Sequence, residues 1–259
     1  MTPLGRGPFD IDRQPVGGSP STAAKPPQLQ ALRIFADAAI ALQALTADFR
    51  DALATTEAAL AQRPGSHGDL LVGPLHRPVR TADRLAQQML AYAGAQQLTP
   101  ASVDLLPLLS GLAGVLRRTL DPRLCVCVDV AHGCPPCHAD AQALREALIN
   151  LVVNARDAMP DGGRIRLSAA PVTAEGGLPA VAVSVSDNGV GMTPEFARRA
   201  VQPFVTTKDN APSAGMGLAA SDGFARQSNG FLKIDSRAGS GVTVTLVLPQ
   251  ATQVHRTDS

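Results

Sequence analysis

The sequence has no tryptophan, and aromatic residues make up only 3% of its 259 positions. Proteins that bind single-stranded nucleic acid by base stacking need aromatic platforms, so this class is disfavoured. The formal net charge is only +1 at pH 7, with acidic and basic residues dispersed along the chain. The charge therefore gives no reason to expect nucleic acid or an anionic membrane surface as a partner.

Long apolar runs are also missing. The longest candidate, LLPLLSGLAGVL at 105–116, contains proline and glycine and is shorter than the roughly 18 residues of a membrane helix. The N-terminus, MTPLGRGPFD, lacks the basic start and apolar stretch of a secretory signal. We therefore expect a cytoplasmic protein without a membrane segment. With 45% apolar and 17% charged residues, the composition fits one large globular domain or two modest ones.

The four cysteines, at 125, 127, 134 and 137, are close together in the sequence. The string HGCPPCH (132–138) fits a redox C-x-x-C and the C-x-x-C-H pattern of haem attachment. Haem attachment needs export, for which no signal is present. A zinc site is a second possibility, because thiolates and imidazoles are good zinc ligands. The simplest interpretation is structural: Cys125 and Cys127 alternate along a strand, and Cys134 and Cys137 pack as small apolar residues.

Two regions precede the part of the chain that mixes helices with strands. Residues 1–28 are rich in Pro, Gly, Ser and Thr, which predicts a disordered tail. Residues 29–98 form a predicted helical hairpin: one helix from Leu29 to about Gln62, a break at 63–69, and a second helix from about Val79 to Gln97. Each helix has one apolar stripe. Because a lone hairpin cannot bury both stripes, we expect pairing with a second copy into a four-helix bundle.

Residues 99–250 mix helices with largely antiparallel strands, which predicts an α+β fold with a layer of helices against one sheet. Helices are expected near 104–119, 140–159 and 216–228. Strands are expected at 124–130, 164–170, 180–187, 231–236 and 242–248, the last two joined by the turn RAGSG. Residues 251–259 are predicted to be a flexible tail.

The helix at 140–159 carries a polar stripe next to its apolar one. Glu146, Asn150, Asn154 and Asp157 follow at steps of four, four and three, so they stack on one face. Such a stripe is often only a solvated surface. Asparagine, however, is a mediocre helix former, and two of them here favour a ligand-binding role.

Two glycine-containing segments follow. In SVSDNGVGM a strand ends at Asp187 and opens into Gly189 and Gly191, where a backbone without side chains can approach a flat ligand. In PFVTTKDNAPSAGMGLAA (203–220), Gly215 and Gly217 precede a helix whose N-terminal N–H groups can hold phosphate. Each segment alone is weak evidence.

Taken together and in order, these segments resemble the ATP-binding domain of sensor histidine kinases, within the superfamily of gyrase, Hsp90 and the mismatch-repair ATPases. ALINLVVNARDAM resembles the N box, DNGVGM the first glycine box, PFVTTK the F box and AGMGLAA the second glycine box. The resemblance covers about Leu90 to Pro249. It implies a two-layer α/β sandwich of the Bergerat type, with ATP and Mg²⁺ as cofactors.

The resemblance also implies roles for single residues. Asn154 would hold Mg²⁺ at the phosphates, with Asp157 close by and with Glu146 and Asn150 as catalytic neighbours. Asp187 would accept a hydrogen bond from the adenine amino group, and Gly189 and Gly191 would lie along the base. The remaining nucleotide contacts implied are Lys208, Gly215, Gly217 and Leu218.

Three departures from the family pattern matter. The gyrase branch has a water-activating Glu where this chain has Asn150, so slow ATP hydrolysis is expected. The lid stretch DNAPSAG contains less glycine than usual. In the first hairpin helix, TADFRDAL resembles the H-D-F-N-N segment of related kinases, with Ala47 at the position of the phosphoacceptor His.

Because an alanine methyl group has no nucleophilic nitrogen, self-phosphorylation at residue 47 is not expected. The resemblance then favours a divergent kinase of two-component signalling that acts on a partner. The alternative is a non-catalytic dimeric regulator that binds nucleotide and docks a response-regulator receiver domain or another kinase. A phosphotransfer protein with a decayed nucleotide site is disfavoured, since the nucleotide boxes are kept and the histidine is not.

Overall fold

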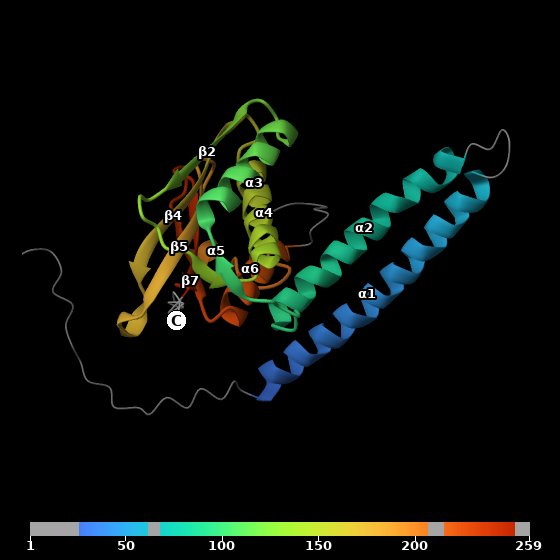
Figure 1. Cartoon of the computed structure of the whole chain (residues 1–259), viewed down its shortest axis with the longest axis horizontal. Helices are drawn as coiled ribbons and strands as arrows, with labels where there is room; N and C mark the ends of the chain where they lie inside the picture. The colour runs from blue at the N-terminus through green and yellow to red at the C-terminus, as the bar shows by residue number, and fades with distance from the viewer. Residues whose placement is uncertain (1–25, 62–67, 207–214, 252–259) are drawn as a thin grey trace, which may run out of the picture.

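A computed structural model of the chain describes residues 26–61, 68–206 and 215–251. The N-terminal tail expected over 1–28 lies almost wholly outside the described residues, as do Lys208 and nearly all of the C-terminal tail. Within the described part the predicted α+β architecture is confirmed: a long helical hairpin precedes a domain of helices packed on one five-stranded sheet (Figure 1).

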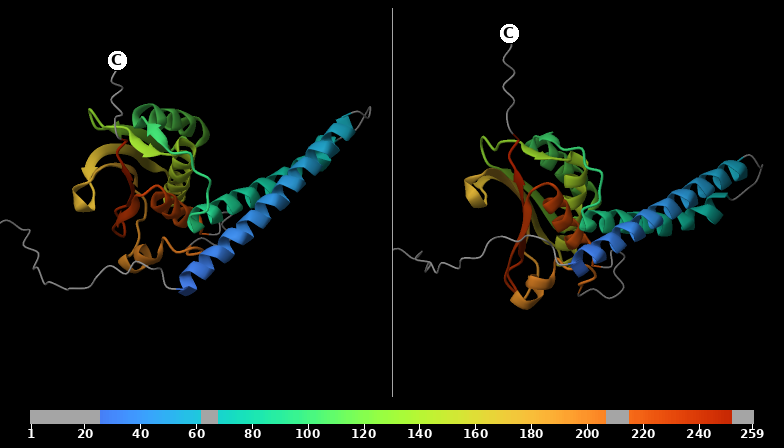
Figure 2. Two further views of the ribbon diagram at one scale, coloured as in Figure 1. Left: turned by 60° about the horizontal axis from the view of Figure 1, so that its bottom comes forward. Right: turned by 90° about the horizontal axis from the view of Figure 1, so that it is seen from below.

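The hairpin consists of α1 (Pro26–Ala61) and α2 (Gly68–Ala93), which lie side by side along most of their length (Figure 2). One turn of α2 fixes their register through Asp83. Its carboxylate accepts hydrogen bonds from Thr46 Oγ1 at 3.3 Å and from Arg50 at 2.9 Å. The hairpin extends away from the sheet domain, and only one end of it contacts that domain (Figure 1).

The second helix begins earlier than the sequence predicts. Proline lacks an N–H and disfavours helix interiors, and Pro74 and Pro78 both precede the expected start at Val79. In the structure α2 begins at Gly68 and includes both prolines. The contacts that α2 as a whole makes with α1 are a source of helix stability that local propensity does not include.

The central sheet has the strand order β2-β4-β5-β7-β6, with β2 parallel to β4 and every other neighbour antiparallel. A small two-stranded sheet pairs β1 with β3. The strands are β1 (Ala101–Val103), β2 (Leu124–Val130), β3 (Cys137–Ala139), β4 (Gly163–Thr173), β5 (Pro179–Asp187), β6 (Phe231–Ser236) and β7 (Val242–Pro249).

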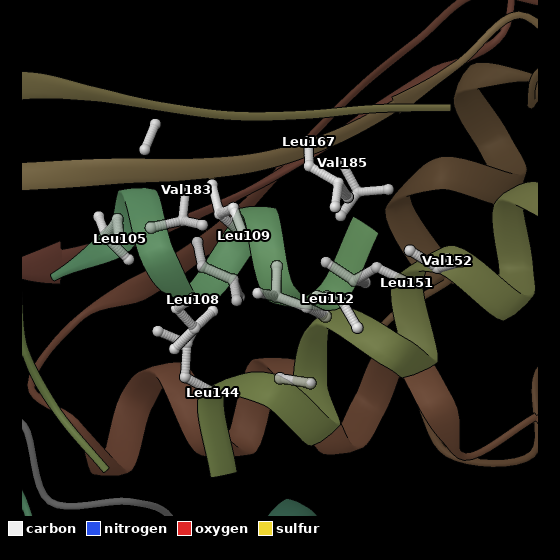
Figure 3. Packing of buried hydrophobic residues seen from close by; sticks show 14 of the residues in the cluster. Leu105, Leu108, Leu109, Leu112, Leu144, Leu151, Val152, Leu167, Val183 and Val185 are labelled. Atoms are coloured by element: carbon white, nitrogen blue, oxygen red, sulfur yellow. The ribbon is translucent and has the colours of Figure 1, made fainter. Parts of the chain in front are cut away.

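Three helices cover one face of this sheet: α3 (Leu105–Thr119), α4 (Ala141–Asp157) and α6 (Gly217–Gln227). Leucines of α3 and α4 interdigitate with valines and leucines of the strands to form the core (Figure 3). The helix starts follow simple capping chemistry. The Asp104 side chain accepts from Leu106 N, and the Asp140 side chain accepts from Gln142 N and Ala143 N.

Four short elements were not predicted: the strands β1 and β3 of the small sheet, one helix and one 3-10 turn. A helix of six residues, α5 (Pro194–Arg199), follows β5, and a 3-10 turn, η1 (Glu175–Gly177), joins β4 to β5. The sequence did carry a signal for α5: Thr193 caps it through a hydrogen bond from Phe196 N, and Pro194 stands in its first turn. In the part of the chain that is described, no helix has the combined length and apolarity needed to cross a bilayer.

Candidate functional site

A cavity of about 360 Å³ opens between the C-terminal half of α4, the end of β5 and the start of α6. Its size is within the usual range of ligand pockets, roughly 300–1,000 Å³. The predicted site residues that line it are Asn154, Asp157, Asp187, Gly191, Gly215, Gly217 and Leu218. Segments more than 60 residues apart in the sequence thus meet at one pocket, and these segments carry the motifs identified in the sequence.

Asp187 is the half-buried carboxylate of this cavity. Its Oδ1 accepts hydrogen bonds from Gly189 N at 2.9 Å and Val242 N at 3.3 Å. Burial raises the pKa of Asp187 above its usual value, and the two backbone N–H groups offset part of that rise. Because both backbone bonds go to one oxygen, Oδ2 can accept a hydrogen bond from a ligand donor in the cavity.

The fold itself requires the two glycines after Asp187, whether or not a ligand is bound. Gly191 has φ +68°, and a Cβ there would lie 2.1 Å from the Arg237 carbonyl oxygen. At Gly189 a Cβ would lie 2.5 Å from the Ala158 carbonyl oxygen. The loop is therefore clamped between the end of α4 and the β6–β7 turn. Gly191 lines the cavity, whereas Gly189 supports the loop from behind.

Gly217, the first residue of α6, differs from these two. A Cβ at this position would meet Asn150 Cβ at 3.6 Å and Asn154 Nδ2 at 3.9 Å, which are ordinary contacts. Among the described residues no side chain caps the start of α6, in contrast to α3, α4 and α5. Uncapped N–H groups at a helix start can bind phosphate, and Gly217 and Leu218 of this helix start line the cavity.

Asn154 and Asp157 reach the same cavity from α4. Asp157 also forms an ion pair with the neighbouring Arg156 at 2.6 Å. In the described ranges no group of three or more His, Cys, Asp or Glu side chains is arranged to hold a metal ion. One amide oxygen and one carboxylate beside a phosphate subsite do, however, fit Mg²⁺, which uses few protein ligands and takes others from phosphate and water.

The other half of the polar stripe faces elsewhere. Glu146 and Asn150 line a second, smaller cavity of about 220 Å³ between α2, α4 and α6, and they are not among the residues of the larger cavity. The Asn150 Oδ1 accepts hydrogen bonds from Arg84 at 3.1 Å and Gln88 at 3.0 Å, both on α2. The catalytic role predicted for Glu146 and Asn150 stays a prediction.

The cavity walls contain apolar residues that motif reasoning did not name. They include Val185 on β5, Val242 and Val244 on β7, Phe196 on α5, and Val205. The three strand residues follow from the alternation of their strands, since they are on the face that is covered by helices. Phe196 belongs to the helix that was not predicted.

The cysteines are all free in the structure. Cys125 is exposed on β2, and Cys137 is buried in the core, where burial raises the pKa of its thiol to about 11. Desolvation also raises the pKa of Cys134, which is half-buried. A thiol with a raised pKa is mostly protonated at neutral pH and is a poor nucleophile.

Ala47, the residue at the expected phosphoacceptor position, is exposed on α1. Its neighbour Thr46 is only 4% exposed, and its hydroxyl donates to the Gln43 carbonyl at 2.9 Å and bonds to Asp83. The side of α1 that presents residue 47 is thus open to solvent.

Residues 139–252 match the family described as histidine kinase-, DNA gyrase B- and HSP90-like ATPases. The sensor kinase CckA of Brucella abortus (strain 2308) is 33% identical over 187 residues, which are 68% of this chain and 20% of that protein. The histidine protein kinase DivJ of Caulobacter vibrioides is 34% identical over 158 residues, 60% of this chain and 24% of that protein. This chain therefore spans only about a fifth to a quarter of the length of these relatives.

Solved structures share the fold. Full-length ShkA in complex with AMPPNP superposes with a TM-score of 0.65 at 24% identity, over 82% of this chain and 46% of that chain. The histidine kinase AdeS of Acinetobacter baumannii gives a TM-score of 0.55 at 14% identity, over 80% of this chain and 96% of that chain.

Proposed function

We propose that the larger cavity binds ATP with Mg²⁺ for two-component signalling, within the domain at 139–252 that matches the histidine kinase-, DNA gyrase B- and HSP90-like ATPase family. The single observation that supports this best is the cavity itself. It brings a half-buried carboxylate at a strand end and an uncapped helix start into the lining of one pocket. These are the two features that a base and a phosphate chain need.

In the proposed complex, Asp187 Oδ2 accepts a hydrogen bond from the exocyclic amine of adenine. The apolar walls formed by β5, β7 and α5 cover the base and exclude water. The N–H groups at the start of α6 bind the phosphates, and Gly217 leaves room for them next to Asn154. Asn154, with Asp157 near it, would hold Mg²⁺, which would neutralise phosphate charge and orient the γ-phosphate.

We further propose that the protein is a divergent kinase that phosphorylates a partner. Residue 47 is alanine and cannot accept the phosphoryl group, whereas most of the residues predicted to bind ATP line one cavity. A homodimer through the hairpin is part of this proposal. Ile34, Leu45 and Phe49 on α1 are more than half exposed and lie on one side of the helix, where a second copy would bury them.

One observation favours a second candidate, a non-catalytic regulator that changes shape with nucleotide. The Asn150 carbonyl is occupied by Arg84 and Gln88 of the hairpin, so the hairpin holds a residue that the family resemblance assigns to the nucleotide site. Such a protein would dock a receiver domain or another kinase without transferring phosphate.

Incubation with γ-labelled ATP, alone and with receiver domains and histidine-bearing kinase domains, separates the two candidates. Acid-labile, base-stable label on a partner supports the kinase. Mg²⁺-dependent ATP binding by calorimetry without label on any protein supports the regulator. If millimolar ATP gives neither heat nor a thermal shift, the nucleotide site itself is refuted.

A further inference from the structure

The hairpin and the ATPase-type domain meet along a seam that consists of α2 with its following residues Gly94–Gln97 on one side and of α4 and α6 on the other. At its centre, Arg84 and Gln88 donate to the same oxygen of Asn150, at 3.1 and 3.0 Å. Gln88 is 4% exposed and Asn150 9%, so these bonds are sheltered from water. The amide of Asn150 is thereby held with its oxygen toward the hairpin.

The same seam includes a backbone contact that tolerates no side chain. A Cβ on Gly223 of α6 would lie 2.1 Å from the Ala91 carbonyl oxygen and 2.6 Å from Tyr92 Cα. Both contacts are with backbone atoms at the end of α2, which cannot rotate away. Any larger residue at position 223 must push α6 and α2 apart. The absence of a side chain at 223 is therefore what allows the seam to close.

The seam also contains polar atoms that closure leaves without partners. Among the described residues, the buried side-chain polar atoms lacking a hydrogen bond are Gln88 Oε1, Gln96 Oε1, Gln227 Oε1 and Ser228 Oγ. All four are in α2, in its connector, or at the end of α6. Each unpaired buried acceptor costs free energy that opening to water would recover. Opening of the seam would expose these atoms to solvent.

A third contact links the hairpin to the edge of the ATP cavity. Phe35 of α1 stacks on Phe204 with ring centroids 6.0 Å apart, and it meets Tyr92 of α2 edge-on at 5.5 Å. Phe204 has φ +64°, an unusual conformation for an aromatic residue. It immediately precedes Val205, a wall residue of the larger cavity.

We propose that the seam withholds Asn150 from the bound nucleotide: Arg84 and Gln88 are positioning residues that keep its amide turned to the hairpin until the seam opens. This rests on the proposed ATP site. The Cβ of Asn150 lies within 3.6 Å of the position that a Gly217 Cβ would occupy, so the residue borders the phosphate end of the cavity. Once released, its side chain can turn toward the phosphates and strengthen binding of Mg²⁺·ATP.

The test opens the seam in two independent ways. Gly223→Ala wedges the backbones of α2 and α6 apart, and the pair Arg84→Ala with Gln88→Ala removes the two donors. Gly111→Ala is the matched control, because it makes the same change within a helix and nothing lies within 4 Å of the new Cβ. Hydrogen exchange of the α2 C-terminal turn reports opening, and calorimetry with a non-hydrolysable ATP analogue and Mg²⁺ reports affinity.

We expect either route to increase exchange at the seam and to tighten Mg²⁺·analogue binding by about fivefold or more, the size of a typical coupling between sites. Gly111→Ala should change neither. The gain should disappear when Asn150→Ala is added, because only a released Asn150 can supply it. A merely structural seam would not produce this dependence on Asn150.

Several outcomes would overturn the proposal. One is an open seam with unchanged or weaker affinity, and another is a gain that persists without Asn150. If Gly223→Ala unfolds in a thermal melt, the Arg84 and Gln88 pair decides alone, and unchanged affinity there is equally decisive. If neither the wild type nor any opened variant binds the analogue, the proposed ATP site fails first, and this proposal fails with it.

Discussion

The two halves of helix α4 carry similar polar residues and face different surroundings. Asn154 and Asp157 line the larger cavity, whereas Glu146 and Asn150, one to two turns earlier, line the smaller one against the hairpin. The stripe from 146 to 157 is about 16 Å long at 1.5 Å per residue, which is longer than one phosphate subsite. Residues on one helix face can therefore serve two sites, and the packing partner decides which.

The largest effect should come from a residue of the larger cavity. Asp187→Asn should weaken ATP binding by about a hundredfold or more: the amide oxygen keeps the two backbone bonds of Oδ1, and the NH2 group that replaces Oδ2 cannot accept from an adenine amine. Calorimetry would measure the loss. Asp129→Asn, on the exposed end of β2 beside Arg166, is the matched control and should bind normally. Unchanged affinity in Asp187→Asn would show that the base lies elsewhere.

The same substitution should not destabilise the free protein. The pKa of Asp187 is raised in the folded state, so its charged form carries a penalty above that pKa, and the penalty is relieved as pH falls. Asparagine keeps an oxygen that can accept the two backbone bonds and removes the charge. The melting temperature of the variant should match or exceed that of the wild type at pH 7, and the difference should shrink toward acid pH. A clear drop at pH 7 would contradict this account of the site.

The next largest effect should distinguish the two asparagines of α4 by their contribution to Mg²⁺·ATP affinity. Asn154→Ala should weaken Mg²⁺·ATP binding by about tenfold through loss of a charge-assisted contact, with a smaller loss in the absence of Mg²⁺. Asn150→Ala in the otherwise unchanged chain should have little effect on affinity, because its carbonyl is held by Arg84 and Gln88. Titrations with and without Mg²⁺ measure both. Equal losses of affinity in both variants would contradict the assignment of Asn154 and Asn150 to different sites.

Gly191 and Gly217 should respond differently to alanine, because the fold requires the first and ligand binding requires the second. Gly191→Ala should lower the free energy of unfolding by about 1–3 kcal/mol, because φ is +68° and the Arg237 carbonyl leaves no space. Gly217→Ala should keep or slightly raise the melting temperature and weaken ATP binding several-fold, since its Cβ enters the phosphate region. Denaturant unfolding and calorimetry on both variants test this. A Gly217→Ala variant with a lowered melting temperature and normal ATP affinity would contradict this distinction.

The smallest signal is expected from the hairpin. Ala47→His should introduce a trace of acid-labile phosphate on incubation with labelled ATP, because position 47 is exposed and is followed by Asp48 and Phe49. Ala44→His, three residues earlier on the same helix and also exposed, is the control and should stay unlabelled. Equal labelling of both variants would show non-specific transfer, and no labelling would indicate that the domain cannot reach the hairpin.

Much of the fold could be read from the sequence because its signals are local. The strand at 124–130 and the helix near 104–119 were predicted from alternation and helical periodicity, and β2 and α3 match them within a residue. The start of α2 was missed, because local propensity does not include the tertiary contacts of a helical hairpin. The six residues of α5 are too few to show a period.

The site was predictable only in part, for a similar reason. The end of β5 and the start of α6 are marked by Asp187 and Gly217, whose roles follow from local motifs. The destination of Asn150 depends on Arg84 and Gln88, more than 60 residues away, and helical spacing contains no information about them. Gly223 lies inside the helix expected near 216–228 and belongs to no motif, and only the approach of Ala91 explains why a glycine is needed there.

The end of α2 has a mechanical consequence. Gly94, at φ +67°, closes the helix: its N–H bonds to Ala91 O, and Ala95 N bonds to Leu90 O, a Schellman arrangement. The 26 residues of α2 form a rod about 39 Å long. A rotation of about 10° at this joint would sweep the far tip of the rod through roughly 7 Å, from the same rise per residue. Small displacements at the base are thus amplified at the tip, as in a lever arm.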